Sequence, residues 1–343
     1  MKKRVLSAMS GGVDSSLTAA MLLEQGYDVT GVTFRLFSPH ENAPNHLADA
    51  KSVAKILGIK HLVFDFSDIF ECEIISYFIN EYMNGRTPNP CVVCNKKIKF
   101  GAALDRAVDL GFDYFATGHY ARTVYDEKLK RFLIKKSLSK KDQTYCLYTL
   151  NQKQLSRIIF PLADFEKTKT REMAKRIGLP VHNKPDSQDI CFISGNHADF
   201  IEKRMGEAGK GNFIDEKGEI LGVHSGIYRY TIGQRRGLGI SAEKRSYVSE
   251  INSENNSIKI GSVPERKTII ATNANFIPFD NLDSPIHVSA RVRYSCNEIP
   301  SIITPLENKT VLVDFKHSVK FVAPGQSVVF YKENTLVGGG IIL

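Results

Sequence analysis

The residues best suited to chemistry lie near the N-terminus, in the segment Ser10-Gly11-Gly12-Val13-Asp14-Ser15. An apolar strand is expected before it, at 3–9, and a helix after it, at 16–25. Two glycines between a strand and a helix let the backbone close around a phosphate, and the free N–H groups of the first helical turn then face the anion. The two serine hydroxyls add donors, and Asp14 is a candidate Mg²⁺ ligand. The segment predicts a nucleotide phosphate site.

This segment lacks the lysine that ends a GxxxxGK[ST] loop, so transfer of a γ-phosphoryl group is not predicted. The pattern SGGxDS resembles instead the PP-loop of enzymes that cleave ATP between the α- and β-phosphates, adenylate a substrate and release pyrophosphate. An ordinary glycine-rich turn is the simpler alternative. The whole hexamer between a strand and a helix favours the PP-loop.

Two cysteine segments predict sulfur chemistry. Cys91 and Cys94 form a CxxC, and Cys94 starts an expected helix at 94–110 with three lysines in its first turns. Both features favour a thiolate and predict a lowered thiol pKa for Cys94. Cys191 lies in a loop-like stretch at 185–193. Two thiols in a domain that activates substrates with ATP suggest that one carries a persulfide and the other resolves it as a disulfide. The remaining cysteines lie among apolar neighbours and are expected to be buried: Cys72, Cys146 and Cys296.

Length and charge set further limits. The chain has 343 residues, which predicts two or three domains. Lys and Arg total 46 against 37 Asp and Glu, a net charge of +9 that suits a polyanionic partner. No apolar run approaches the roughly 20 residues that span a bilayer, and no signal peptide is recognised, so a cytoplasmic protein is expected. Basic residues cluster at 96–99, 128–141, 167–176 and 235–236.

Strand and helix patterns alternate from residue 1 to about 195. Such alternation predicts a doubly wound, mostly parallel sheet with helices on both faces. Ligands bind at the carboxyl ends of such strands, so Gly118-His119, which follow an expected strand at 114–117, could line one pocket with the phosphate loop. Further strands are expected at 29–34 and 61–66, and further helices at 47–57, 69–82, 94–110 and 170–178.

The remaining third is richer in β patterns. A hairpin is expected at 247–251 and 258–260 around an Asn-rich turn, and strands at 288–294 and 327–331. We therefore predict an α/β nucleotide-binding domain at 1–195, a small β-rich domain at 196–266 and a C-terminal β-barrel at 267–343.

The chain closely resembles the bacterial tRNA-specific 2-thiouridylases, with an N-terminal domain like the adenine nucleotide alpha hydrolases. The matching stretches keep the family's order along the whole chain, and the last is the most specific. They are SGGVDSS at 10–16, TPNPCVVCNKKIKF at 87–100, ATGHYAR at 116–122, KKDQTYCLY at 140–148, PDSQDICFI at 185–193 and YTIGQRRGLGI at 230–240.

The resemblance implies an enzyme that uses Mg²⁺ and ATP to adenylate the C2 oxygen of the wobble uridine in tRNAs for Lys, Glu and Gln. It implies that Cys191 carries persulfide sulfur from a relay protein or cysteine desulfurase, and that Cys94 is the nucleophile that forms a transient disulfide with Cys191. The residues implied to bind ATP are Ala8, Met9, Ser10, Gly11, Gly12, Val13, Asp14, Ser15, Phe34 and Gly118. Those implied to contact the flipped base are Asn89, Pro90 and Cys91. Those implied to contact tRNA are His119, Lys141, Asp142, Gln143, Arg293, Tyr294 and Gln326.

One position departs from the family's usual pattern. Many members carry Asp three residues before the nucleophilic cysteine, where this chain carries Cys91. Cys91, Cys94 and Cys191 could therefore ligate a [4Fe–4S] cluster with one open iron that holds sulfide. The simpler alternative is that Cys91 replaces Asp beside the base.

Two rival functions explain part of the chain. Another PP-loop ligase that forms AMP while acting on a small metabolite would account for the phosphate loop, but not for the placed cysteines. A non-catalytic RNA-binding protein that uses ATP as a switch would account for the charge and the barrel. Replacing Cys94 and Cys191 with Ser should stop thiolation but leave a small-metabolite ligase largely active. Pyrophosphate release that depends on tRNA would exclude a non-catalytic RNA-binding protein.

Overall fold

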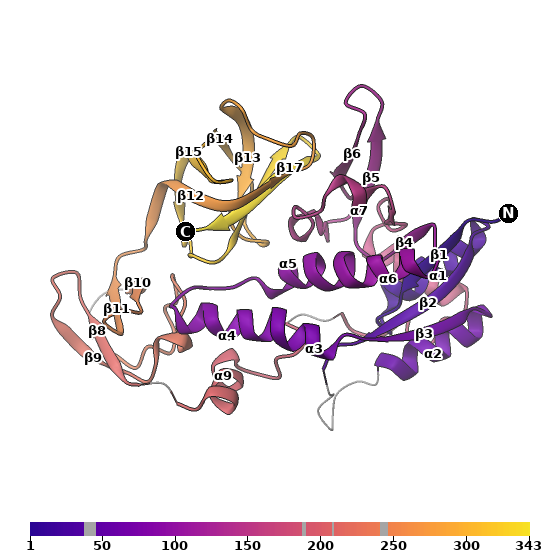
Figure 1. Cartoon of the computed structure of the whole chain (residues 1–343). Coiled ribbons are helices and arrows are strands. Elements are labelled where there is room, and N and C mark those ends of the chain that lie inside the picture. The colour runs from indigo at the N-terminus through magenta and orange to yellow at the C-terminus, as the bar shows by residue number, and fades with distance from the viewer. Residues whose placement is uncertain (38–45, 187–189, 208, 241–245) are drawn as a thin grey trace.

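The N-terminal part is built on a parallel sheet of five strands, in the order β3-β2-β1-β4-β7 (Figure 1). The computed structural model describes residues 1–37, 46–186, 190–207, 209–240 and 246–343. Every neighbouring pair in this sheet is parallel, which confirms the doubly wound prediction. The strands are β1 (Arg4–Ala8), β2 (Asp28–Arg35), β3 (Lys60–Asp65), β4 (Tyr114–Ala116) and β7 (Ile158–Ile159).

The strand order reverses between β1 and β4. The chain runs from β1 outward to β2 and β3, then returns to place β4 on the other side of β1. Val5 and Leu6 are fully buried, as expected for a strand covered by helices on both faces. The crevice for a ligand therefore lies where the carboxyl ends of β1 and β4 meet.

Helices cover the sheet, and two of them differ from the expected single rods. The segment expected at 69–82 consists of α3 (Ser67–Phe70), a π-helical stretch (Glu71–Ile75) and α4 (Ser76–Met83). The segment expected at 94–110 begins four residues earlier, as α5 (Pro90–Cys94), a π-helical stretch (Asn95–Ala102) and α6 (Ala103–Asp109). The other helices are α1 (Val13–Glu24), α2 (His46–Leu57), α7 (Gln152–Leu155), α8 (Lys167–Arg176) and α9 (His197–Met205). None of the helices in the described ranges is both long and apolar enough to cross a membrane.

The central region holds a four-stranded sheet in the order β10-β11-β8-β9. The predicted hairpin is confirmed as the antiparallel pair β10 and β11, with Asn256 in a left-handed conformation at the turn (φ 51°). The strands are β8 (Gly211–Ile214), β9 (Ile220–His224), β10 (Tyr247–Asn252) and β11 (Ser257–Gly261).

The predicted C-terminal β-barrel is confirmed, and the structure shows it as a closed antiparallel ring of six strands. Strand β12 pairs with both β15 and β17, which closes the ring around a core that includes Val313, Phe315 and Phe330. The strands are β12 (Glu265–Phe276), β13 (Ile286–Arg291), β14 (Ile299–Pro305), β15 (Val311–Lys320), β16 (Ser327–Lys332) and β17 (Thr335–Ile342).

A hairpin from the N-terminal part extends the sheet of this barrel. Strands β5 (Ala121–Asp126) and β6 (Arg131–Lys136) follow β4 in the sequence, yet β6 pairs with β17 through Lys135 and Thr335. Figure 1 shows this hairpin beside the barrel and above the parallel sheet. The sequence analysis did not predict it. It joins the nucleotide-binding part and the barrel through backbone hydrogen bonds.

Candidate active site

The predicted phosphate loop lies at the carboxyl end of β1. Gly11 has a φ of +70°, and a Cβ atom there would lie 2.5 Å from the carbonyl oxygen of His46, so this position requires glycine. Ser15 Oγ accepts a hydrogen bond from the backbone N–H of Ser10 at 3.1 Å. Gly12 precedes α1 in an extended conformation and supplies no side-chain cap. The N–H groups of the first turn of α1 therefore face the loop, as a phosphate site requires.

The end of β4 packs directly against this loop. A Cβ atom at Gly118 would lie 2.8 Å from the backbone nitrogen of Ser15. At the end of the neighbouring β2, the Phe34 ring contacts Phe66 at a centroid distance of 5.5 Å. The structure thus brings the predicted ATP-binding residues, from Ala8 to Ser15 together with Phe34 and Gly118, to one edge of the sheet.

Asp14, the candidate Mg²⁺ ligand, is already paired. Lys167 Nζ donates to both of its carboxylate oxygens, at 2.7 and 2.6 Å, and the hydroxyl of Tyr120 donates at 2.7 Å. Burial and the charge of Asp14 raise the pKa of Tyr120, so the phenol stays a donor. Oxygen donors of this kind fit Mg²⁺, provided that Lys167 gives up its place. The sequence analysis did not single out Tyr120, and it placed Lys167 only in a basic cluster.

The segment at 182–186 contacts the phosphate loop directly through a hydrogen bond and indirectly through the ion pairs of Lys167. Lys184 Nζ donates to the carbonyl oxygen of Gly11 at 3.1 Å and to Asp49 at 2.5 Å. Asp186 pairs with Lys167 at 2.9 Å, with Arg171 at 2.7 Å and with Lys141. Burial opposes ionisation of Asp186, but its hydrogen bonds with the two lysines lower its pKa to about 2. This segment begins the motif that contains Cys191; positions 187–189 of the motif lie outside the described residues.

The segment at 89–91, which is predicted to contact the base, starts a helix. Asn89 Oδ1 accepts a hydrogen bond from the backbone N–H of Val92 at 3.3 Å, and Pro90 occupies the first helical position, where its missing N–H costs nothing. Helix α5 therefore begins before Cys94, which lies at its last residue instead of its N-terminus. The contact of Asn89, Pro90 and Cys91 with the base stays a prediction.

The structure brings three cysteines together. Cys94 is buried, Cys91 and Cys191 reach the surface, and all three are free thiols. Burial, together with smaller contributions from the nearby thiols of Cys94 and Cys91, raises the pKa of Cys191 to about 12. The predicted low pKa of Cys94 is wrong: burial raises it, and the charge of Lys99 offsets only part of that effect.

The cysteines do not form an assembled metal site. Within the described part of the chain, no group of three or more His, Cys, Asp or Glu residues is arranged to hold a metal ion. Ligation of a [4Fe–4S] cluster by Cys91, Cys94 and Cys191 stays a prediction, and we derive no step through one.

The prediction that the other three cysteines are buried is wrong. Cys72 is exposed, and Cys146 and Cys296 are partly buried. Cys72 follows α3 on a helical face that turns to solvent, which its apolar neighbours did not reveal. Burial raises the pKa of Cys146 to about 12, and Cys91 lies near enough to contribute. Cys146 is thus a further thiol beside the candidate site, which the sequence analysis missed.

The predicted tRNA contacts already hold protein partners. His119 is buried and its Nδ1 lies 2.7 Å from Thr117 Oγ1. Gln326 Nε2 donates to the carbonyl oxygens of Thr87 and Pro88, at 3.0 and 3.2 Å. Tyr294 is 47% exposed. The others are also engaged: Lys141 pairs with Asp186, Asp142 accepts from Thr144 at 2.6 Å, Gln143 accepts from the N–H of Tyr120 at 3.0 Å, and Arg293 donates to the carbonyl of Ile232 at 3.3 Å. Their contacts with tRNA stay a prediction.

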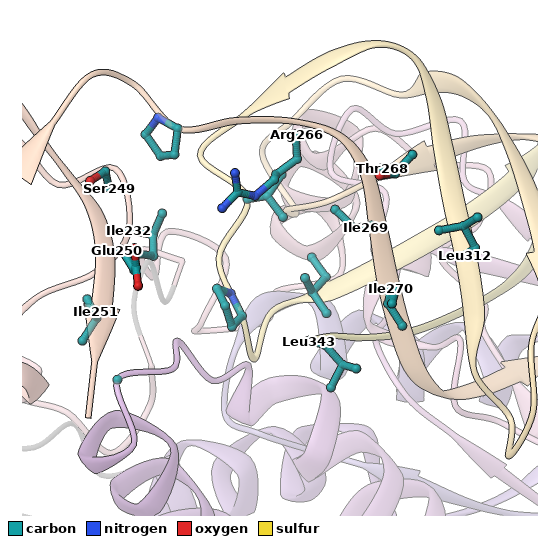
Figure 2. A pocket seen from close by; sticks show the side chains of 15 residues that line it. Ile232, Ser249, Glu250, Ile251, Arg266, Thr268, Ile269, Ile270, Leu312 and Leu343 are labelled. Atoms are coloured by element: carbon teal, nitrogen blue, oxygen red, sulfur yellow. The ribbon is translucent and has the colours of Figure 1, made fainter. Parts of the chain in front are cut away.

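A cavity of about 440 Å³ lies elsewhere, between the central sheet and the barrel. Figure 2 shows Arg266 in the space between the strand that carries Ser249 and Ile251 and the barrel strand that carries Ile269. None of the residues predicted to bind ATP or to carry sulfur lines this cavity. It is therefore separate from the candidate active site.

A phosphate loop at the switch point of a parallel sheet, in a domain that also carries a group of thiols and is followed by two β-domains, defines the class of nucleotide-binding enzymes with a HUP domain. The family model described as "tRNA methyl transferase HUP domain" matches residues 3–195. A "PRC-barrel domain" model of the same series matches 198–262, and an "Aminomethyltransferase beta-barrel domain" model matches 266–342.

Full-length relatives narrow the class to one family. Proteins named tRNA-specific 2-thiouridylase from Clostridium botulinum (strain Hall) and Caldicellulosiruptor saccharolyticus are each 48% identical to this chain, over 100% of it and 99% of the relative. One from Acetivibrio thermocellus is 48% identical over 99% of both chains. The chain belongs to the tRNA-specific 2-thiouridylase (MnmA) family.

Proposed function

We propose that this protein makes 2-thiouridine at the wobble position of tRNAs for Lys, Glu and Gln, using ATP and Mg²⁺, in the cytoplasm. The observation that carries the proposal is one arrangement: a phosphate loop and the thiols of Cys94 and Cys191 lie in the same domain. The segment at 182–186, which leads toward Cys191, is anchored on that loop. Family membership supports the substrate.

The first step activates the base. The C2 oxygen of uridine attacks the α-phosphorus, an O–P bond forms, and the bond to the bridging oxygen breaks with its electron pair passing to pyrophosphate. The uridine loses its N3 proton. AMP then departs more readily than a bare carbonyl oxygen could, because the negative charge that leaves with it is spread over a phosphate.

The second step exchanges oxygen for sulfur. The terminal sulfur of a Cys191 persulfide attacks C2, the C2–O bond breaks and AMP leaves. The Cys94 thiolate then attacks the inner sulfur of Cys191, so the S–S bond breaks and its electron pair stays with the sulfur on C2. The products are 2-thiouridine and a Cys94–Cys191 disulfide. Two thiols thus supply the electrons, and an external thiol must reduce the enzyme.

The sulfur donor is a relay protein or a cysteine desulfurase, and the residues at 89–91 hold the extruded base. Sequence-specific readers of RNA splay single bases out of loops, which fits a helix start where Pro90 is buried and Cys91 is exposed. Cys91 then contacts the base in place of the usual aspartate.

Cysteine substitutions test the proposal. Cys94→Ser and Cys191→Ser variants should form no 2-thiouridine in tRNA incubated with ATP and a persulfide donor, as measured by mass spectrometry of nucleosides. The exposed Cys72→Ser variant is the matched control and should keep activity. Cys191→Ser should still release pyrophosphate when tRNA is present. Thiolated product from Cys191→Ser would remove this residue from the sulfur path.

The same measurement excludes other functions. A PP-loop ligase for a small metabolite should tolerate both substitutions, and an RNA-binding switch should release no pyrophosphate. The family model's description mentions methyl transfer, and nucleoside mass spectrometry distinguishes an added methyl group from sulfur exchanged for oxygen.

A further inference from the structure

Lys167 occupies an unusual position between two carboxylates. Its Nζ lies 2.7 and 2.6 Å from the two oxygens of Asp14 and 2.9 Å from Asp186 Oδ1, and its side chain is 12% exposed. Asp14 belongs to the phosphate loop, whereas Lys167 comes from 153 residues further along the chain. A poorly solvated ammonium is therefore fixed at the mouth of the predicted nucleotide site.

The fold places this ammonium at the N-terminal end of α1. Lys167 is the first residue of α8, which packs against α1, and Thr170 one turn later bonds to Tyr120 at 3.0 Å. Tyr120 in turn bonds to Asp14. The PP-loop motif carries no lysine of its own, unlike the GxxxxGK[ST] loop, so a cation for the phosphates has to come from elsewhere in the fold.

The charges around Lys167 permit an exchange of partners. Asp186 also pairs with Lys141 and with Arg171, so it stays neutralised when Lys167 turns away. Asp14 pairs with Lys167 in this structure and can bind Mg²⁺ in its place. In that exchange the Asp14 carboxylate gains Mg²⁺ and the Lys167 ammonium gains phosphate oxygens, so no buried charge is left unpaired.

We propose that Lys167 binds the β- and γ-phosphates of ATP, and that it stabilises the pyrophosphate leaving group after exchanging Asp14 for phosphate oxygens. This deepens the proposed function and depends on the loop being a PP-loop. As the bond from the α-phosphorus to the bridging oxygen breaks, its electron pair moves onto pyrophosphate, and the ammonium of Lys167 faces that charge.

Nucleotide binding without tRNA tests this role. Titration calorimetry should show that Lys167→Met weakens binding of Mg·ATP and of Mg·pyrophosphate at least about tenfold, with AMP binding within about twofold of wild type. Lys169→Met is the matched control: Lys169 lies on the same helix, is exposed and forms an ion pair with Glu172, and its replacement should change none of the three affinities. Lys167→Arg should recover part of the ATP affinity.

Two outcomes would overturn the proposal. Unchanged ATP affinity in Lys167→Met would show that the ammonium does not meet the phosphates. Equal losses for ATP and AMP would show a structural role only. If Lys167→Met does not fold, the double variant Lys167→Met/Asp186→Asn, which removes one charge of each sign, is measured in the same way. Thiolation is not assayed in this experiment, so failure of the sulfur chemistry and failure of this assignment stay distinguishable.

Discussion

At the scale of single residues, the ion pairs and pKa values of the site depend on burial and on neighbouring side chains, which the sequence alone does not show. Asp14 could be predicted as a candidate Mg²⁺ ligand from the hexamer around it. Its pairing with Lys167 could not, because that contact requires α8 to pack against α1. The thiol pKa of Cys94 was predicted in the wrong direction for the same reason: the lysines beside it are visible in the sequence, but the burial that outweighs them is not.

Replacing Asp14 with Asn should abolish most adenylation and leave tRNA affinity nearly intact, since Asp14 lies in the phosphate loop. We expect pyrophosphate release that depends on tRNA to fall about 100-fold. Filter binding of tRNA should change less than about twofold, and the exposed Asp109→Asn variant should match wild type in both assays. A large loss of tRNA affinity in Asp14→Asn would contradict the assigned role.

The pKa of Cys191 predicts how its reactivity depends on pH. Because burial raises this pKa to about 12, the neutral thiol dominates near neutral pH, and the thiolate fraction rises tenfold with each pH unit below that value. Alkylation of Cys191 by iodoacetamide, followed by peptide mass spectrometry from about pH 7 to about pH 10, should therefore keep accelerating and stay slower than that of free cysteine. A plateau near pH 8 would show that the thiolate is stabilised in the free enzyme.

At the scale of elements, the edge where β1 and β4 end needs close backbone contact. Gly118→Ala places a Cβ atom 2.8 Å from the Ser15 nitrogen, so the phosphate loop must shift. We expect at least tenfold weaker ATP binding by calorimetry and a loss of about 1–3 kcal/mol in the free energy of unfolding. Gly209→Ala, where a Cβ atom meets nothing within 4 Å, is the control. Unchanged ATP affinity in Gly118→Ala would show that the close packing of Gly118 against the phosphate loop is not needed for ATP binding.

The barrel also positions the base-contact segment. Gln326 donates to the carbonyl oxygens of Thr87 and Pro88, and the Thr87 N–H donates to Pro324 at 2.8 Å. Gln326→Ala should therefore speed amide hydrogen exchange at 86–92 and cost about 1 kcal/mol of stability. The exposed Glu307→Ala variant should leave that exchange unchanged. If exchange at 86–92 does not change in Gln326→Ala, the barrel does not hold this segment.

The elements themselves were predicted where local pattern decides them. The apolar run before the hexamer and the alternation around Val29 specify β1 and β2, and glycines mark the ends of several helices. The pairing of β6 with β17 was missed because Thr335 lies 200 residues beyond its partner Lys135. The start of α5 at Pro90 was missed because the helix was expected to begin at Cys94, although proline suits a first helical turn.

At the scale of the whole molecule, the net charge of +9 predicts that tRNA binding weakens steeply with salt. Each neutralised phosphate should contribute a slope of roughly −0.7 to −0.9 in a plot of log affinity against log salt. The exposed pair Arg235 and Arg236 offers a test, since replacing both with Ala should make the slope shallower by about one to two units. A flat response in the wild-type protein would exclude a basic docking surface.

The domain boundaries after residues 195 and 266 stay a prediction, which limited proteolysis can test.

The pairing of β6 with β17 has a consequence for synthesis of the chain on the ribosome. The β5–β6 hairpin leaves the ribosome well before β17, which follows it about 200 residues later in the chain. Exposed strand edges recruit strands from other chains, so nascent chains of this protein should be prone to association until β17 has emerged and paired with β6. A truncation that removes β17 would leave that edge open permanently, and such a product should accumulate in inclusion bodies even though its nucleotide-binding part is whole.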